Sequence, residues 1–504
     1  MEARRGNAMT GPPVAGAPAG GRLVAWMRAP DLIALALVAI TVLATRAVWF
    51  GDPVADFDEQ LYSFIGWRMT HGELPFVDWW DRKPFGLFAI FAAIHALFGP
   101  ETLAYQGVAC VFVLAGSAIT YRLARRLADP FASACAAAIY AMLLSAYASY
   151  SAQSEVFFTP LILGMAALLA DRDHPHFARR SLAAMLLGGF ALQIKYTVLP
   201  QCAFFGGWAL WVSYRRGASN TGLVSQAAVF ALAGLAPTLL VAGFYAAIGE
   251  FDAFWFANFQ SFFDRVAAPQ GRWSESHWIG LTPLVVLAAG GVCAALRLRA
   301  PHDATLWRYF CGWAVATLGT VLLPGTVYLY YYAALAAPVA LVAVPLLDRR
   351  TPAGMVPGLV LVSILWTLLA MPARHAQAGA ERDATHRMAA AIAPYVGADR
   401  NCLFVWDGPT VLYRMTGSCT PSRFVYPDHL NNALETRAIG IDQTAEVARI
   451  LATRPGAIVT ANRPMTLQNP QATALVERAL ERNYRQDVSV RMNDRTITAW
   501  LRRP

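Results

Sequence analysis

The side chains best suited to catalysis or ligand binding gather in one stretch of the chain, residues 51–83. Asp58 and Glu59 stand side by side there, and Tyr62 follows one helical turn after Asp58. A carboxylate can accept a proton from a nucleophile, cations can hold an anion, and aromatic rings can stack on a sugar. An ordinary solvated loop with an aromatic belt would have the same composition. Only the order of the residues can distinguish such a loop from a functional site. The other polar candidates in the stretch are Arg68, Asp78 and Lys83.

The composition places this stretch in a membrane protein. The chain has 504 residues, of which 57% are hydrophobic and only 14% charged, whereas soluble domains carry roughly 25% charged residues. A spanning helix needs about 20 mainly apolar residues. The sequence predicts eleven spans, at residues 31–50, 103–122, 131–149, 156–170, 181–199, 200–213, 223–248, 278–296, 309–323, 330–347 and 354–371.

One apolar segment does not fit this series. Residues 83–98 are apolar but short, and counting them as a span would place the arginines around Arg125 outside the cell. Since positively charged loops stay in the cytoplasm, we expect an interfacial or re-entrant helix here. The arginine clusters then predict a multi-pass protein of the bacterial inner membrane, with residues 1–30 as a flexible cytoplasmic tail and residues 31–372 as the transmembrane domain.

Residues 373–504 are predicted to form a separate periplasmic domain. They hold 29 of the 73 charged residues, and strand-like and helical segments alternate in them, which is typical of a small α/β sheet. No catalytic constellation stands out in this part, which would cover the acceptor side of a site or stabilise the fold. Cys402 and Cys419 are its only cysteines. An oxidising compartment would let them form a disulfide, and two unpaired buried thiols are the alternative.

Several functions are disfavoured by the same sequence. The net charge of +9 is spread over short loops with no basic run suited to nucleic acid. No glycine-rich nucleotide loop is present, which argues against an ATP-driven pump. No histidine or cysteine spacing is typical of zinc. Asp56, Asp58 and Glu155 could hold a hard divalent ion, but we predict neither a metal nor a cofactor.

The order of residues in the loop resembles a known family. Asp58-Glu59, Tyr62 and then the run WWDRKP at 79–84 resemble the first external loop of GT-C glycosyltransferases, nearest to the family 39 type. That group includes protein O-mannosyltransferases and the aminoarabinose and galacturonic acid transferases that act on lipopolysaccharide. Phe85 replaces the second proline of the family motif. The resemblance extends over about residues 31–350, through 152–155, 193–196 and 328–338, although the last segment lacks the family's cation.

The resemblance implies roles for individual residues. Asp58 would be the general base, with Glu59 or Asp56 as the alternatives, and Glu59 could instead orient the loop or cap the next helix. Lys83 and Lys195 would hold the lipid phosphate, unless they only snorkel to the membrane surface. Residues expected to take part in substrate binding are Lys83, Lys195, Asp78, Glu155, Tyr62, Arg68 and Arg272, with Arg265 as a further candidate cation.

The expected function is transfer of a sugar from a polyprenyl-phosphate donor to a lipid, glycan or protein acceptor on the periplasmic face. The expected fold is a mainly α, polytopic GT-C bundle with a small C-terminal α/β domain. A transporter or flippase of lipid-linked or small polar substrates is the alternative. Transporters place charges near the middle of the membrane, whereas here the acidic and basic groups gather at one outer surface. That distribution favours catalysis.

Overall fold

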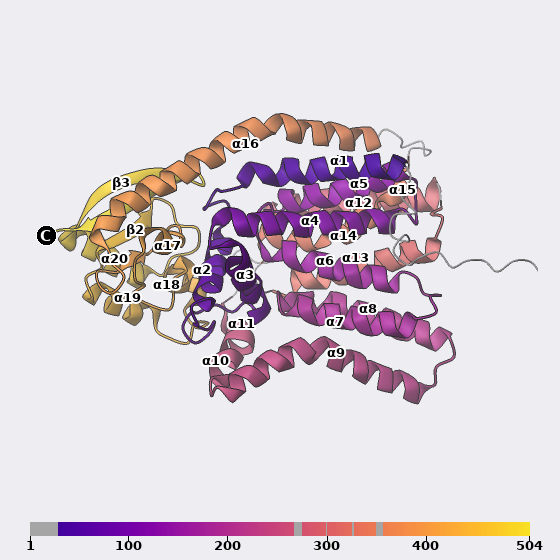
Figure 1. The fold of residues 1–504 in the computed structure, drawn as a ribbon, viewed down its shortest axis with the longest axis horizontal. Helices are drawn as coiled ribbons and strands as arrows, with labels where there is room; N and C mark the ends of the chain where they lie inside the picture. The colour runs from indigo at the N-terminus through magenta and orange to yellow at the C-terminus, as the bar shows by residue number, and fades with distance from the viewer. Residues whose placement is uncertain (1–28, 267–274, 299, 325–326, 349–355) are drawn as a thin grey trace, which may run out of the picture.

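The structure is a computed structural model that describes residues 29–504, apart from 267–274, 299, 325–326 and 349–355. Most of the predicted tail, 1–30, and the candidate Arg272 therefore lie outside the described residues. The described part consists of a long helical bundle and a small sheet-containing domain at one end of it, where the chain also ends (Figure 1).

The bundle contains helical structure at each of the eleven predicted spans. Among the described residues, five helices are both long and apolar enough to cross a membrane by length and composition, and several shorter apolar helices accompany them. The protein is therefore a multi-pass membrane protein. The helices of the bundle are α1 (Ala29–Arg46), α4 (Thr102–Ala124), α5 (Pro130–Ala146), α6 (Ser154–Leu169), α7 (Phe177–Leu192), α8 (Leu199–Arg215), α9 (Asn220–Ala247), α12 (Glu275–Arg297), α13 (Ala304–Leu322), α14 (Ala336–Val342), α15 (Val344–Leu347) and α16 (Val356–Ile392).

Small residues let the central helices approach closely. α5 has the sequence PFASACAAAIYAMLLSA, and its side chains are nearly all buried. At the contact with α4, a Cβ on Gly116 would lie 2.4 Å from the Tyr140 hydroxyl. Such close contacts favour helix association where no water is present to drive it. α9 lies at the periphery and exposes apolar side chains such as Leu239 and Leu240, which is the surface expected next to lipid.

Two helices lie between the bundle and the C-terminal domain (Figure 1). α2 (Phe57–Met69) contains Asp58 and Glu59, and α3 (Phe85–Phe98) is the short apolar segment of the sequence. The two helices approach closely at Gly66, where an added Cβ would lie only 2.6 Å from that of Phe91. Three short helical segments, α10 (Phe251–Trp255), η4 (Phe256–Gln260) and α11 (Ser261–Asp264), follow α9.

The C-terminal domain is built on a sheet of four strands in the order β1-β2-β4-β3. β1 (Leu403–Val405) pairs in parallel with β2 (Ala457–Ala461), while β4 (Arg495–Arg502) is antiparallel to both β2 and β3 (Tyr484–Met492). Its helices are α17 (Leu412–Thr416), α18 (Pro427–Asn431), α19 (Gln443–Ala452) and α20 (Pro470–Asn483). The predicted fold class, a helical membrane bundle with a small C-terminal α/β domain, is confirmed.

Two features of this domain differ in detail from the sequence interpretation. α16 is one continuous helix that runs along the bundle and into the C-terminal domain, so it passes through the expected boundary at 372 (Figure 1). β3 was not predicted, because most of its side chains are exposed and the apolar alternation that marks a half-buried strand is confined to its second half, Val488, Val490 and Met492. The structure joins Cys402 and Cys419 in a disulfide with Cα atoms 4.8 Å apart.

The orientation of the bundle can be tested with single cysteines. In a variant lacking the five free cysteines, Asp487→Cys on β3 should react with a membrane-impermeant thiol reagent on intact spheroplasts. Asp173→Cys, between α6 and α7, should react only after lysis, because positive loops stay in the cytoplasm. Both positions are exposed. Labelling of Asp173→Cys in intact cells would show that the predicted topology is inverted.

Candidate active site

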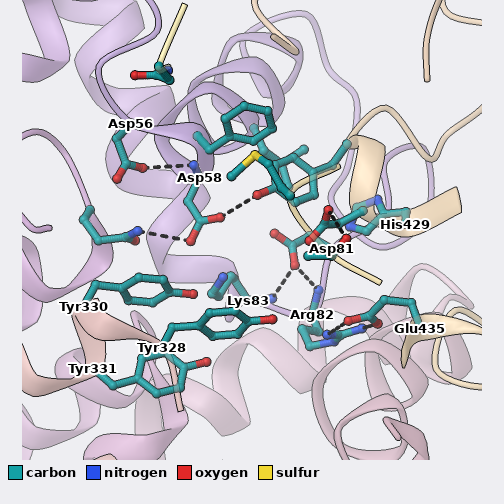
Figure 2. A pocket seen from close by; sticks show the side chains of 18 of the residues that line it. Asp56, Asp58, Asp81, Arg82, Lys83, Tyr328, Tyr330, Tyr331, His429 and Glu435 are labelled. Carbon is teal, nitrogen blue, oxygen red and sulfur yellow. Dashed lines mark hydrogen bonds and ion pairs between the residues drawn. The ribbon is translucent and has the colours of Figure 1, made fainter. Parts of the chain in front are cut away.

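A cavity of about 550 Å³ lies between the loop around α2, the bundle and the C-terminal domain (Figure 2). The bundle side of it includes η5 (Leu329–Leu335). Acidic, basic and aromatic side chains from these separate parts of the chain face one another across it. Its polar and aromatic lining consists of Asp56, Phe57, Asp58, Asp81, Arg82, Lys83, Tyr150, Gln153, Arg265, Tyr328, Tyr330, Tyr331, Tyr426, Asp428, His429, Glu435, Thr466, Asn493 and Arg495.

Asp58 is placed in this cavity by the way α2 begins. Asp56 is the N-cap residue, and its side chain accepts hydrogen bonds from the backbone amides of Asp58 at 2.9 Å and Glu59 at 3.1 Å. A carboxylate in this position satisfies amides that the helix itself leaves free. Burial and the neighbouring charges of Asp58 and Glu59 raise the pKa of Asp56 well above its usual value.

The Asp58 carboxylate accepts three hydrogen bonds. Tyr426 donates to Oδ1 at 2.9 Å, while Gln153 and Tyr62 donate to Oδ2 at 3.1 and 3.2 Å. Burial disfavours the charged form, but the Lys83 ammonium and the donated hydrogen bonds outweigh it, so the pKa of Asp58 lies below its usual value. Asp58 is therefore ionised at neutral pH and can accept a proton.

Lys83 lies in the cavity beside Asp58 and Asp81 (Figure 2). Its ammonium lies 5.1 Å from the centre of the Tyr62 ring. Burial disfavours the charged form of Lys83, but these two carboxylates more than compensate and raise its pKa. Lys83 is therefore a fixed positive charge within reach of any anion that enters.

A smaller cavity of about 130 Å³ adjoins the first and shares Arg82, Lys83, Arg265 and Tyr331 with it. Lys195 lines this second cavity, forms an ion pair with the buried Glu155, and lies 4.2 Å from the Tyr331 ring centre. The two lysines of the chain thus line adjoining cavities, and Lys83 lines both of them. Among the described residues, no group of three or more metal-ligating side chains is placed to hold an ion.

The C-terminal domain supplies a wall of the cavity, which the sequence did not reveal. The Tyr426 hydroxyl donates a hydrogen bond to Asp58, and Glu435 forms ion pairs with both Arg82 and Arg265. The sequence left open whether this domain covers the acceptor side of a site or only stabilises the fold, and it named no residue of the domain as part of a site. It contained no signal for these two residues, because Tyr426 lies 368 positions after Asp58 and Glu435 lies 353 positions after Arg82.

Glu59 is fully buried and faces away from the cavity. It accepts a hydrogen bond from the Ala152 amide at 2.7 Å and one from the Gln106 side chain at 3.3 Å. Burial raises the pKa of Glu59 to about 7. These contacts hold the turn that precedes α6, and this turn carries Gln153 to the Asp58 carboxylate. The geometry corresponds to the positioning role that the sequence left open for Glu59.

The remaining candidates lie at different places. Tyr62 is buried behind the cavity wall, with its hydroxyl on Asp58. Arg68 forms an ion pair with Glu73 and lies 5.3 Å from the Trp79 ring centre, outside the cavity. Asp78 is exposed and accepts a hydrogen bond from the Leu74 amide at 2.8 Å. Substrate binding by Arg68 and Asp78 stays a prediction without a contact to the cavity.

Comparison with known proteins gives the class of this molecule. Residues 82–240 match the dolichyl-phosphate-mannose-protein mannosyltransferase family model. The structure of ArnT from Cupriavidus metallidurans bound to undecaprenyl phosphate matches with a TM-score of 0.58 and 15% identity, over 96% of this chain and 98% of that chain. Its apo form matches with 0.58 and 15%, over 94% and 98%. No curated protein sequence matches.

These comparisons confirm the resemblance that the first external loop predicts. The protein has the GT-C fold, and the family match together with that fold indicates a glycosyltransferase rather than a transporter. The matched segment 82–240 contains Lys83, Glu155 and Lys195 but begins after Asp58. The role of Asp58 therefore depends on the geometry described above.

The ion pairs of Glu435 generate a test of how the two parts are held together. Glu435→Gln leaves two partly buried guanidinium groups without their carboxylate, and breaking such a pair costs about 3 to 5 kcal/mol. We expect faster hydrogen exchange in residues 427–435 and a lower melting temperature. Asp494→Asn removes the pair with Arg491, in which both side chains are at least 80% exposed, and is the control, which should change neither quantity appreciably.

The same pair predicts a dependence on pH. Burial disfavours its charged form, but Arg82 and Arg265 lower the pKa of Glu435 to about 2. Because the folded pKa is depressed, the stabilisation is present above the unfolded pKa of about 4.3 and is lost as the pH falls toward 2. The melting temperatures of the wild type and Glu435→Gln should converge over this range. A constant difference down to pH 2 would contradict the assignment.

Proposed function

We propose that the protein transfers a sugar from a polyprenyl-phosphate donor to an acceptor at the outer surface of the inner membrane, with Asp58 as the general base. The observation that supports this most directly is the ionised Asp58 carboxylate in a cavity that adjoins a smaller one lined by Lys83 and Lys195. A base and a group of cations thus lie side by side, with Lys83 lining both cavities. Direct transfer of a glycosyl group requires both.

The smaller cavity fits the phosphate end of a lipid donor. Lys83, Lys195 and Arg265 supply positive charge to it, while Phe262, Val266 and Pro324 supply apolar surface. A polyprenyl phosphate presents the same two chemistries at the junction between its phosphate and its isoprenoid chain. The matching ArnT structure contains undecaprenyl phosphate, and this supports the same class of donor here.

The proposed reaction is a single displacement at the anomeric carbon. The acceptor oxygen attacks this carbon while its proton passes to Asp58, so that the nucleophile gains reactivity as it bonds. The bond between the anomeric carbon and the phosphate oxygen breaks, and its electron pair leaves with the polyprenyl phosphate. Lys83, Lys195 and Arg265 stabilise the negative charge that develops on this leaving group. Attack opposite to the leaving group inverts the anomeric configuration.

Other residues of the cavity act through Asp58. Tyr62, Gln153 and Tyr426 each donate to its carboxylate and hold it in one orientation. Glu59 fixes the turn that carries Gln153 and is a positioning residue in this proposal. The acceptor approaches the larger cavity, which opens beside the C-terminal domain, and it is a lipid, a glycan or a protein. The proposal places this domain in the periplasm.

Asp58→Asn tests the base directly. The amide keeps the size of the side chain but takes up no proton, so turnover of a polyprenyl-phosphate sugar should fall by about 10² to 10⁴-fold. The melting temperature and detergent monodispersity should stay near those of the wild type. Asp252→Asn on the exposed face of α10 is the matched control and should keep full turnover. Undiminished turnover by purified Asp58→Asn would exclude this residue as the base.

The pH profile separates Asp58 from the other candidate carboxylates. A general base must be deprotonated, so the rate falls as the pH falls through its pKa. The pKa of Asp58 lies below its usual value, whereas burial raises the pKa of Glu59 and Asp428 to about 7. With Asp58 as the base, kcat/KM should stay level from about pH 8 to about pH 5. Half-maximal activity at about pH 7 would instead indicate Glu59 or Asp428.

A further inference from the structure

A separate cavity of about 670 Å³ lies where α4 begins, between that helix, α16 and α17. Arg382, His386 and Arg414 line it, together with Glu101 and Leu103. It shares no residue with the cavity around Asp58 or with the smaller one beside it. Nothing in the transfer reaction proposed above uses these side chains.

The arginines of this cavity are poorly matched by acids. Within the described part of the chain, Arg382 forms no ion pair or hydrogen bond with another residue. Arg414 reaches only Glu101, at 3.9 Å, and the Glu101 side chain is 78% exposed. A pair that long and that exposed contributes little. Two guanidinium groups are therefore available to an anion from outside the protein.

The start of α4 adds to this positive potential. α4 is a helix of 23 residues whose N-cap residue, Glu101, makes no capping hydrogen bond with its side chain. Thr102 and Leu103, in its first turn, line the cavity. Uncapped amides and the helix dipole favour an anion at such an end. The helix end and the arginines come from distant parts of the sequence and converge on one space.

The cavity lies at the level where the bundle leaves the hydrophobic zone. α4 is one of the helices apolar and long enough to cross a membrane, and the cavity is at its first residue. Leu103 is 54% exposed beside it. α16 exposes Trp366 and Leu369, becomes charged from Arg374 onward, and carries Arg382 about two turns later. An exposed apolar residue at the start of a spanning helix, beside cationic groups, is typical of a site at the depth of lipid headgroups.

We propose that this cavity binds the phosphate headgroup of an anionic membrane phospholipid. Arg382 and Arg414 contact the phosphate oxygens, the first amides of α4 face the same group, and the acyl chains follow the exposed apolar surface beside Leu103. The site is distinct from the donor site and does not depend on the transfer reaction. A Cβ on Gly51 would lie 3.4 Å from the Arg382 guanidinium, so a bound lipid would also connect α16 with the loop that leads to α2.

The test uses the full-length protein in detergent and native mass spectrometry. Binding of phosphatidylglycerol and of phosphatidylcholine with the same acyl chains is titrated for the wild type and for Arg382→Gln/Arg414→Gln. Two lost guanidinium contacts should weaken phosphatidylglycerol binding about thirty-fold. Arg478→Gln/Arg482→Gln, on the exposed surface of α20, removes the same charge and should bind as the wild type does.

The proposal is overturned if Arg382→Gln/Arg414→Gln binds phosphatidylglycerol as tightly as the wild type, or if the control variant loses as much affinity. It is also overturned if the wild type binds phosphatidylcholine as tightly as phosphatidylglycerol. Displacement of the lipid by inorganic phosphate at a comparable concentration would overturn it as well. If the double variant does not fold, photo-crosslinking of the wild type with a headgroup-reactive phosphatidylglycerol decides. Crosslinks to residues 382–390 or 414–415 support the site. Crosslinks confined to other peptides overturn it.

Discussion

A buried carboxylate stays charged only if the protein surrounds it with donors and cations, and the candidate site depends on this constraint at Asp58. Tyr62, Gln153 and Tyr426 bond to its two oxygens, and Lys83 adds a neighbouring positive charge. Without them, burial would raise the pKa of Asp58, as it does for Asp428, and a protonated acid cannot act as a base.

This requirement explains why the site is assembled from distant segments. α2 supplies Asp58, the turn before α6 supplies Gln153, and the C-terminal domain supplies Tyr426. Each segment has its own anchor: Glu59 holds the turn, and Glu435 joins the C-terminal domain to Arg82 and Arg265. The buried acids outside the reaction therefore keep the donors of Asp58 in place.

Local patterns in the sequence were sufficient for the fold class and part of the site. Apolar segments of spanning length predicted the bundle, and the order of residues from Asp58 to Lys83 indicated where the polar groups meet. Lys195 was found through the resemblance of residues 193–196 to the family. The approach works where a residue's role follows from its immediate neighbours in sequence.

The parts that sequence reasoning missed are those set by contacts across the chain. Tyr426 and Glu435 have ordinary neighbours in sequence and become part of the site only through docking of their domain. β3 was missed because its outward side chains are polar on an edge strand. Arg68 was predicted as a substrate ligand and stays one, and its contacts with Glu73 and Trp79 could not be read from the sequence.

The arrangement of charge in the candidate site also suggests why a base and an anion site should adjoin. Lys83 lies near Asp58 and Asp81, and Lys195 is paired with Glu155, so each lysine already has acidic neighbours. In the proposed reaction, Asp58 loses its negative charge when it takes up the acceptor proton, and one neighbour of Lys83 is neutralised. In the same step, negative charge grows on the departing phosphate. The attraction of Lys83 for that phosphate is therefore stronger in the transition state than in the ground state, which is the condition under which binding energy increases the rate.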